Sequence, residues 1–290
     1  MPHLRAVTPD EIERFWLWEL ASTVEGALGE LIDPDALSVA EARGWCERVG
    51  WPSTVYRYDE RFSSQYWLLG EQGIVGTVGA GNFPRGGGAL PVESLYVRPG
   101  DRRAGHATRA LETMYLSAVA EGLGGICLET NWSWQPAVQY YLNRGMWLWN
   151  WKHSLAFVRL TQLPRWELVR SADALTFCVE RSSGLLPLLT ARRNGSRLVL
   201  TEAPLYNRLK SKDSRWMLLH NARATLALCA AVEGRPLVRS DAAWDEASRY
   251  ADCGEPEGLA YKIQIFERVA RDNGWRVTTP VIPGIPSYVD

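Results

Sequence analysis

Apolar and polar residues at the start of the chain change from the spacing of a strand to the spacing of helices. Residues 4–7 predict a short strand, and residues 8–11 (Thr-Pro-Asp-Glu) predict the start of a helix that runs to about Leu31. A second helix is expected over residues 35–49, where apolar side chains recur on one face before Gly50. Two helices therefore precede the main sheet.

The next segment consists of short β-prone runs separated by turn residues. Strands are expected at residues 54–58, 65–69 and 74–79, in the arrangement of an antiparallel meander. After a glycine-rich loop, residues 92–97 predict another strand, which ends at Pro99.

Helices and strands then alternate. Residues 107–122 predict a helix, because apolar residues recur there at positions i, i+3, i+4, i+7 and i+8. A strand at residues 126–130, a helix at 136–143 and a pair of strands within 146–160 follow. This order of elements predicts the α/β (α+β) fold class.

The regular order of elements stops after Leu163 and Pro164. We therefore expect one domain over residues 1–163 and a second, smaller α+β domain of unknown role over residues 164–290. Its elements are expected as strands at residues 174–180, 186–191 and 197–200 and as helices at residues 216–232, 241–250 and 259–273.

The charge balance argues against a polyanionic or membrane partner. The 290 residues carry 32 Lys and Arg against 33 Asp and Glu, a net charge of −1, so nucleic acid is not expected as a partner. No apolar run of about 18 residues could span a bilayer, and no targeting segment precedes the first element. A soluble, cytoplasmic protein is predicted, and a homodimer is left open.

Cysteine and histidine spacing favours neither a disulfide framework nor a metal site. The five cysteines are scattered, and none of them forms a Cys-x-x-Cys pair. The four histidines lack metal-ligand spacing as well, so no metal is expected.

Tryptophan is unusually frequent, with 14 copies. Trp147, Trp149 and Trp151 alternate along a predicted strand, which would place the three indoles on one face. Two interpretations are open: a packed core or seam against the C-terminal domain, or an aromatic wall of a binding pocket.

Residues 92–108 run from a predicted strand through a tight turn into a predicted helix. Gly105 and the small Ala107 would let the backbone approach a ligand closely, and the first N–H groups of a helix favour an anion. Arg102 and Arg103 add charge that can neutralise a phosphate through forked hydrogen bonds. This stretch therefore predicts a pyrophosphate-binding loop.

The same stretch resembles the acyl-CoA loop of the GNAT superfamily of N-acyltransferases. The family pattern is Arg or Gln, two residues, Gly, one residue, then Gly or Ala, which Arg102, Gly105 and Ala107 satisfy. The family also places a Leu-x-Val strand end and a proline before this loop, matched here by Leu95, Val97 and Pro99.

A second match lies downstream, where the family has Asn-x-x-Ala-x-x-x-Tyr-x-x-x-Gly-Phe after a strand. The matching residues are Ala137, Tyr141, Gly145 and Met146, whereas Trp134 stands at the Asn position. The resemblance covers about residues 4–160 and implies a GNAT-like splayed mixed β-sheet flanked by helices. The C-terminal region resembles no family that we recognise.

The resemblance implies that the first domain binds acetyl-CoA or another acyl-CoA. By this resemblance the cofactor-binding residues are Leu95, Tyr96, Val97, Arg102, Arg103, Ala104, Gly105, His106, Ala107, Thr108 and Ala137. The backbone N–H of Val97 would hydrogen-bond the thioester carbonyl as an oxyanion donor.

The catalytic groups follow from the same comparison. Tyr141 matches the family tyrosine near the cofactor sulfur and is expected to act as the acid. Glu93, on the strand leading to the acyl site, is a candidate base or a surface residue. His106 is an alternative base, although its place in the loop favours a position beside the pyrophosphate. Cys127, in mid-strand, is interpreted as a buried thiol and not as a nucleophile.

The leading hypothesis is an N-acyltransferase, most simply an N-acetyltransferase, that acylates a primary amine of a small molecule or peptide by direct attack in a ternary complex. Asn131, Trp132 and Trp134 are expected to line the acceptor pocket. Trp134 also motivates the alternative, a non-catalytic acyl-CoA sensor or scaffold with the C-terminal domain as effector. A third option is an acyl donor other than acyl-CoA, such as a carrier protein or aminoacyl-tRNA.

Overall fold

The structure is a computed structural model. It describes residues 3–55, 64–81, 88–130, 134–150, 155–161, 163–194 and 197–202, together with residues 222, 225–226, 228–229 and 237–239. The chain divides into two compact units: unit 1 comprises Met1–Glu129 and Val158–Thr161, and unit 2 comprises Thr130–Phe157 and Gln162–Asp290. The domain boundary expected near residue 163 stays a prediction.

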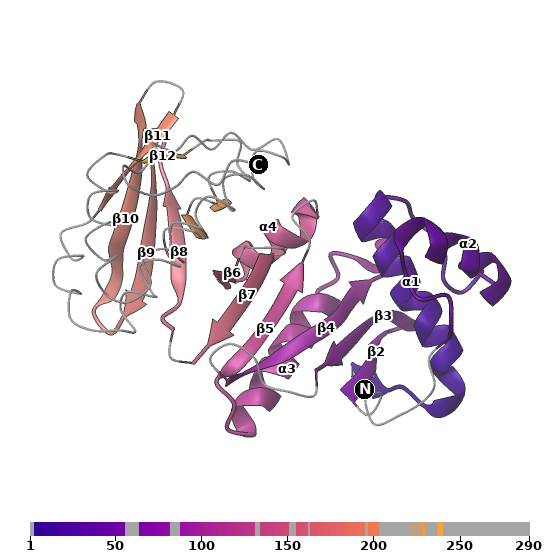
Figure 1. The fold of residues 1–290 in the computed structure, drawn as a ribbon. Coiled ribbons are helices and arrows are strands. Elements are labelled where there is room, and N and C mark those ends of the chain that lie inside the picture. Colours follow the sequence, from indigo (N-terminus) through magenta and orange to yellow (C-terminus); the bar gives the residue numbers. More distant parts are fainter. Residues whose placement is uncertain are drawn as a thin grey trace, which may run out of the picture. The chain divides into compact units, whose positions relative to one another are not determined.

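Unit 1 follows the predicted order of elements (Figure 1). They are β1 (Leu4–Ala6), η1 (Pro9–Glu11), α1 (Ile12–Leu28), α2 (Val39–Val49), β2 (Gln65–Gly70), β3 (Gly73–Ala80), β4 (Ala89–Val97), η4 (Pro99–Asp101), α3 (His106–Ala120) and β5 (Gly125–Thr130). The strand expected at residues 54–58 lies largely outside the described residues.

Helix α2 begins four residues later than expected, because its cap is Ser38. The Ser38 side chain accepts a hydrogen bond from the backbone N–H of Glu41, whose carboxylate in turn accepts the backbone N–H of Ser38. This reciprocal capping box satisfies two otherwise free donors at the helix start. Gly50 then ends α2 in the left-handed conformation.

A mixed sheet forms the centre of the fold. Strands β1 to β4 pair antiparallel in sequence order, and β4 pairs parallel with β5. The full hydrogen-bonded order is β1-β2-β3-β4-β5-β7-β6, with β6 at Trp147–Asn150 and β7 at Leu155–Leu160. A mixed sheet flanked by helices confirms the predicted fold class.

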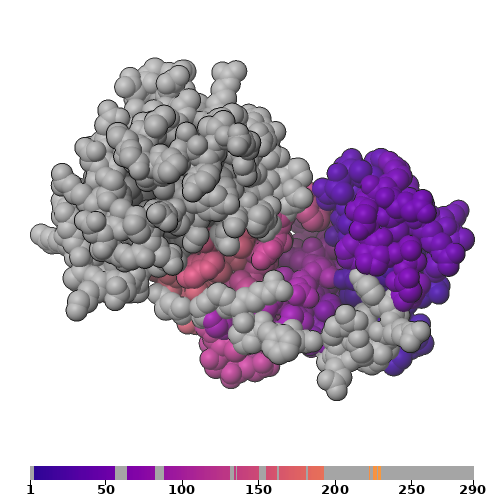
Figure 2. Space-filling view, viewed as in Figure 1, coloured from indigo at the N-terminus to yellow at the C-terminus, as the bar shows by residue number. Residues whose placement is uncertain are grey.

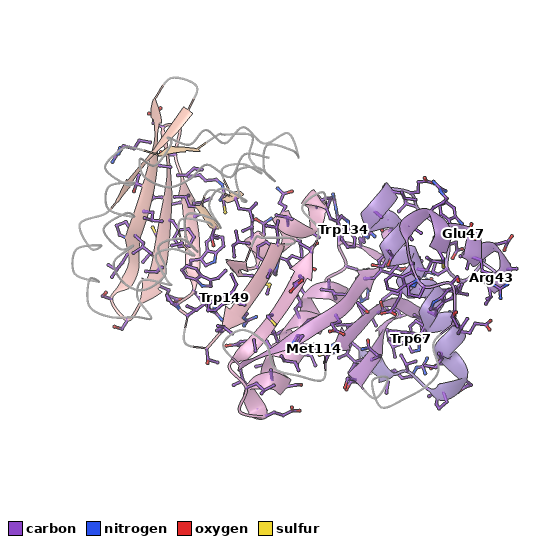
Figure 3. All side chains as sticks on the ribbon, viewed as in Figure 1. Arg43, Glu47, Trp67, Met114, Trp134 and Trp149 are labelled. Atoms are coloured by element: carbon purple, nitrogen blue, oxygen red, sulfur yellow. The ribbon has the colours of Figure 1, made fainter. Side chains whose placement is uncertain are left out.

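Aromatic side chains join α1 to one face of this sheet. The Trp67 ring on β2 contacts Phe15 and Trp18 of α1 edge-on, with ring centroids 5.4 and 5.9 Å apart. Tyr96 on β4 packs against Trp18 in the same manner, at 6.2 Å. Figure 3 labels Trp67 among these side chains, and Figure 2 shows the surface of α1 and α2 in indigo. Since Trp67 and Tyr96 are buried, this face carries one core cluster of unit 1.

Unit 2 contains a second sheet with the order β12-β11-β10-β9-β8. Its strands are β8 (Trp166–Arg170), β9 (Ala174–Arg181), β10 (Gly184–Asn194), β11 (Arg197–Glu202) and β12 (Leu237–Arg239), and α4 (Gln135–Asn143) belongs to the same unit. Strands β9 to β11 were expected, whereas β8 and β12 were missed. The helices expected at residues 241–250 and 259–273 lie outside the described residues, as does most of 216–232.

Rings also pack within unit 2. The buried Trp147 contacts Phe177 edge-on at 5.4 Å, and its indole N–H donates to the carbonyl oxygen of Pro164 at 3.0 Å. Trp166 stacks on Phe177 as well, with the ring centroids 4.9 Å apart. Trp147 is therefore a packing residue, in agreement with the core interpretation. Trp149 is half-buried, and Trp151 lies outside the described residues.

Candidate functional site

Strand β4 carries an irregularity just before the loop that the sequence singles out. Thr77 of β3 pairs with Tyr96, but Gly79 pairs with Glu93, so two β4 residues lie opposite one β3 residue. Such a β-bulge bends the strand and redirects its groups. Ser94, within the bulge, has a positive φ of 51°, which is uncommon for any residue but glycine. The buried Thr77 hydroxyl donates to the carbonyl oxygen of Ser94 at 2.7 Å and fixes this conformation.

Strand β4 separates from β5 close to the bulge. Of the described residues in the two strands, three pairs form their ladder: Ala89 with Gly125, Leu90 with Ile126, and Pro91 with Cys127. The remaining residues of β4 therefore have an open side where β5 no longer pairs with them. This is the splayed arrangement that the resemblance implied.

The peptide N–H of Val97 is directed to that open side. The N–H of Arg98 donates to the carbonyl oxygen of Val75 on β3 at 2.9 Å. Facing pairs alternate between hydrogen-bonded and non-hydrogen-bonded in an antiparallel ladder, so the next pair, Val97 with Gly76, directs its groups away from the partner strand. The carbonyl oxygen of Val97 agrees with this, because it accepts a bond from Arg102 and not from β3.

The loop after β4 places the start of α3 in the open. Arg103 and Gly105 both have left-handed backbone conformations, with φ of 66° and 83°. Gly105 is the N-cap of α3, and a Cβ added there would meet no atom within 4 Å. The first turn of α3 contains no acidic residue. The first N–H groups of the helix therefore face a position that suits an anion.

The two loop arginines differ in their surroundings. Arg102 forms a forked ion pair with Glu25 of α1, at 2.7 and 2.5 Å, and its Nε donates to the carbonyl oxygen of Val97 at 2.8 Å. The hydrogen bond to Glu25 raises the pKa of Arg102 above its ordinary value. Arg102 is nevertheless exposed, as are Arg103 and Ala104.

His106 is part-buried at the start of α3. Its Nδ1 lies 2.9 Å from a guanidinium nitrogen of Arg109, and a guanidinium can only donate. Nδ1 is therefore the acceptor, which leaves the proton of a neutral ring on Nε2. The next residues, Ala107 and Thr108, are also part-buried.

Glu93 lies on the α1 face of the sheet, just before the bulge. Glu93 pairs with Gly79, and Thr77, two residues earlier on β3, pairs with Tyr96. Residues two apart on a strand point to the same face, so Glu93 lies on the same face as Tyr96. Glu93 is exposed, and its carboxylate lies over Gly81, where an added Cβ would be 2.8 Å from Oε1. Leu95, in the bulge, is half-buried. Cys127 of β5 is buried, as expected for a structural thiol.

Helix α4 holds the candidate acid within unit 2. Tyr141 is buried with its ring 5.5 Å from the rings of Tyr140 and Phe157. Burial raises the pKa of its phenol well above 10, so the hydroxyl keeps its proton at neutral pH. Trp134, labelled in Figure 3, is the half-buried N-cap of α4, and Ala137 is half-buried in its first turn. Asn131 and Trp132 lie outside the described residues.

Residues 36–146 match the sequence model of the acetyltransferase (GNAT) family. This segment is similar to the GNAT family. The match includes the β4 bulge, the whole loop and Tyr141, and it confirms the resemblance seen in the sequence. No curated protein matches the chain.

Several solved structures resemble about half of the chain. A GNAT-family acetyltransferase from Staphylococcus aureus Mu50 shares 14% identity, covering 55% of this chain and 98% of that one, with a TM-score of 0.38. N-acetylglutamate synthase from Neisseria gonorrhoeae, solved with coenzyme A and N-acetylglutamate, shares 15% identity over 54% and 34% of the chains, with a TM-score of 0.36. PaiA N-acetyltransferase from Thermoplasma acidophilum, solved with coenzyme A, shares 10% identity over 54% and 97%, with a TM-score of 0.41.

Outside the GNAT motifs, the structure adds residues that the sequence did not indicate. Glu19 and Glu25 of α1 bond to Ser94 and Arg102 from 75 and 77 positions away. No local pattern reports a contact at that separation. Within the described residues, no three His, Cys, Asp or Glu side chains group as metal ligands would, and no helix has the length and apolarity of a membrane span.

Proposed function

We propose that the protein is an N-acyltransferase that transfers an acyl group, most simply acetyl, from acyl-CoA to a primary amine by direct attack in a ternary complex. The observation that supports this most directly is the β4–α3 segment of the GNAT-like part. In it, a bulged strand with an outward N–H at Val97 leads through two left-handed residues to an open helix start. This combination suits a ligand with a carbonyl at one end and a phosphate at the other.

The loop also fits the pyrophosphate of coenzyme A by its surroundings. Gly105 leaves open space, no acid lies in the first turn of α3, and the exposed Arg103 can approach a phosphate. Backbone N–H groups and a guanidinium together neutralise such an anion. We infer that Arg103, Ala104, Gly105 and the first turn of α3 hold the pyrophosphate.

A bound acyl-CoA would supply an activated thioester. The Val97 N–H donates to the carbonyl oxygen, on which negative charge grows as the amine attacks. Glu93 removes the proton of the incoming ammonium, directly or through water, and Tyr141 gives its proton to the departing thiolate. The raised pKa of Tyr141 keeps that proton available at neutral pH.

Release of free coenzyme A from acetyl-CoA in the presence of a panel of primary amines tests the proposal. We expect amine-dependent release, and we expect Tyr141→Phe to lose most turnover while it retains its affinity for acetyl-CoA. Glu93→Gln should remove the base from the pH–rate profile. Unchanged turnover in Tyr141→Phe would exclude it as the acid, and an unchanged pH profile would exclude Glu93.

A second candidate function is a non-catalytic acyl-CoA sensor. Trp134 favours it, because this bulky residue, whose side chain makes no capping hydrogen bond, stands at the N-cap of α4 where the GNAT pattern has Asn. A sensor would bind acetyl-CoA without releasing coenzyme A for any amine. Quenching of tryptophan fluorescence by an amine, but not by coenzyme A, would place the acceptor at the indoles. The cytoplasmic location and the homodimer stay predictions from the sequence.

A further inference from the structure

Two carboxylates of α1 contact the β4–α3 segment on either side of Val97. Glu19 accepts a hydrogen bond from the hydroxyl of Ser94, three residues before Val97. Glu25 accepts two bonds from the guanidinium of Arg102, five residues after Val97. Helix α1 thus bonds to both ends of the segment that carries the outward N–H.

The two contacts lie at or next to residues with a positive φ. Ser94 has a φ of 51°, and Arg102 immediately precedes Arg103, which has a φ of 66°. A non-glycine residue persists in this region only where its surroundings hold it there. Six residues separate the two glutamates, which corresponds to about 9 Å along the helix axis. One rigid helix therefore sets the spacing of both contacts.

Arg102 joins the second contact to Val97 itself. Its Nε donates to the Val97 carbonyl oxygen while its two terminal nitrogens bond to Glu25, so each nitrogen has an internal acceptor. The Glu25 side chain is only 12% exposed, against 37% for Arg102. The guanidinium also lies 5.7 Å from the centre of the ring of Tyr96, which belongs to a core cluster of unit 1. These contacts direct the guanidinium of Arg102 toward α1, although Arg102, like Arg103, is an exposed residue.

We propose that Glu19 and Glu25 are positioning residues of the acyl-transfer site. They hold the β4 bulge and the loop to α1, and so fix the direction of the Val97 N–H. Arg102 is part of this connection and not a pyrophosphate ligand, which leaves the phosphate to Arg103 and the backbone. This inference rests on the proposed function for its catalytic consequence, but the connection itself can be measured without any substrate.

The first experiment uses the full chain without ligand. Glu25→Gln, Arg102→Gln and their double variant are compared by thermal unfolding, and amide hydrogen exchange is followed in peptides that cover residues 94–102. We expect faster exchange in each single variant and non-additive losses of stability in the double variant, since both changes break one contact. Glu13→Gln, an exposed carboxylate on the same helix, is the matched control and should leave exchange unchanged. Additive losses with unaltered exchange would overturn the proposal.

The second experiment measures kinetics with acetyl-CoA and an accepted amine. Glu25→Gln and Glu19→Ala should lower kcat by about 10- to 100-fold, because a small misplacement of a transition-state donor is enough for such a loss. Glu19→Gln keeps an oxygen acceptor for Ser94 and should recover most of the rate. Arg103→Gln should instead raise KM for acetyl-CoA with kcat nearly unchanged.

The outcomes separate the two proposals. If Arg102→Gln raises KM for acetyl-CoA more than Arg103→Gln does, with normal stability and exchange, Arg102 is a phosphate ligand and the inference is wrong. If the ligand-free results hold but no amine releases coenzyme A, the connection between α1 and β4 stands and the proposed acyltransferase activity fails.

Discussion

The β4–α3 segment of unit 1 and the α4–β8 segment of unit 2 are stabilised by different kinds of contact. Directional bonds from α1 hold the first: a carboxylate bonds to Ser94, and a forked ion pair bonds to Arg102. Ring contacts hold the second, among them Tyr141 with Phe157 and Trp147 with Phe177. Ring packing fills volume but leaves a peptide group free to tilt, whereas a hydrogen bond restricts direction. The polar contacts occur where a backbone N–H has to point one way.

Charged contacts recur throughout the described part of unit 1. Arg5 pairs with Glu11, Arg14 with Asp35, and Arg98 with Asp101. Most of these pairs are partly exposed, and salt and pH act strongly on partly exposed charges. Contacts between aromatic rings are not sensitive to salt or pH. The comparison therefore predicts that unit 1 and unit 2 lose stability under different conditions.

The largest expected effect concerns the aromatic side of the comparison. Trp147→Ala removes a buried indole together with its contact to Phe177 and its bond to Pro164, which should cost about 3–5 kcal/mol. Urea denaturation of the full chain, followed by far-UV circular dichroism, measures the loss. The loss should be equal at low and high salt. Trp149→Ala, on the same strand but half-buried, is the control and should cost clearly less.

The sequence predicted the loop well, but in the aromatic half of this comparison it missed strand β8. Gly105 and Arg102 lie within eight residues of a strand end and a helix start, so local spacing reveals the loop. Strand β8 was missed because it has only five residues, begins at Trp166 directly after a Pro-Arg pair, and carries two charged side chains. The segment becomes a strand because it pairs with β9, and pairing with another strand leaves no pattern in the local sequence.

The candidate site shows the same limit. A serine in a β-prone run gives no sign of a positive φ, and the bulge at Ser94 depends on Thr77 from another strand. In the sequence, Glu19 and Glu25 look like ordinary acidic residues of an amphipathic helix. Their partners lie about 75 positions away in the sequence, so tertiary packing determines these contacts. A single sequence does not show which distant residues will meet.

The second prediction tests the charged side. Glu11 accepts bonds from Arg5, Thr8 and Trp67, and the bonds from Arg5 contribute most to lowering its pKa from 4.5 to about 2. A carboxylate with a lowered pKa stabilises the fold above its ordinary pKa, and this contribution disappears as the pH falls from about 4.5 to about 2. Its side chain is 18% exposed, so Glu11→Gln should cost about 2–3 kcal/mol at pH 7.

A pH series of urea denaturation checks this. The wild type should lose stability steeply between pH 4.5 and 2, and the Glu11→Gln curve should be flatter and should approach the wild-type curve at the acid end. Glu13→Gln, exposed and two residues away, should change stability by less than about 0.5 kcal/mol. Parallel wild-type and Glu11→Gln curves would show that Glu11 acts through packing and not through its charge.

The third prediction compares two glycines of unit 1. Gly105 has a φ of 83° with open space around it, so Gly105→Ala carries only the conformational cost of about 1–2 kcal/mol. Gly44, exposed within α2, also has open space but no positive φ, and Gly44→Ala should add up to about 1 kcal/mol of stability. Opposite signs in thermal unfolding are expected. A stabilising Gly105→Ala would show that the loop adopts another backbone conformation in solution.

The smallest effect is expected at Gln65, a buried polar residue of unit 1. Its side chain is 8% exposed and lies over Gly79, next to β4, but its Oε1 has no hydrogen-bond partner among the described residues. A buried carbonyl without a donor costs free energy, so the apolar Gln65→Leu should be neutral or stabilising by up to about 1 kcal/mol. The backbone bond from Val7 to the Gln65 carbonyl stays intact in this variant. Thermal unfolding measures the change, and a clear loss would show that the amide has a donor whose contribution exceeds the cost of burial. A neutral result with altered amine turnover would mean that the amide instead serves a ligand beside the bulge.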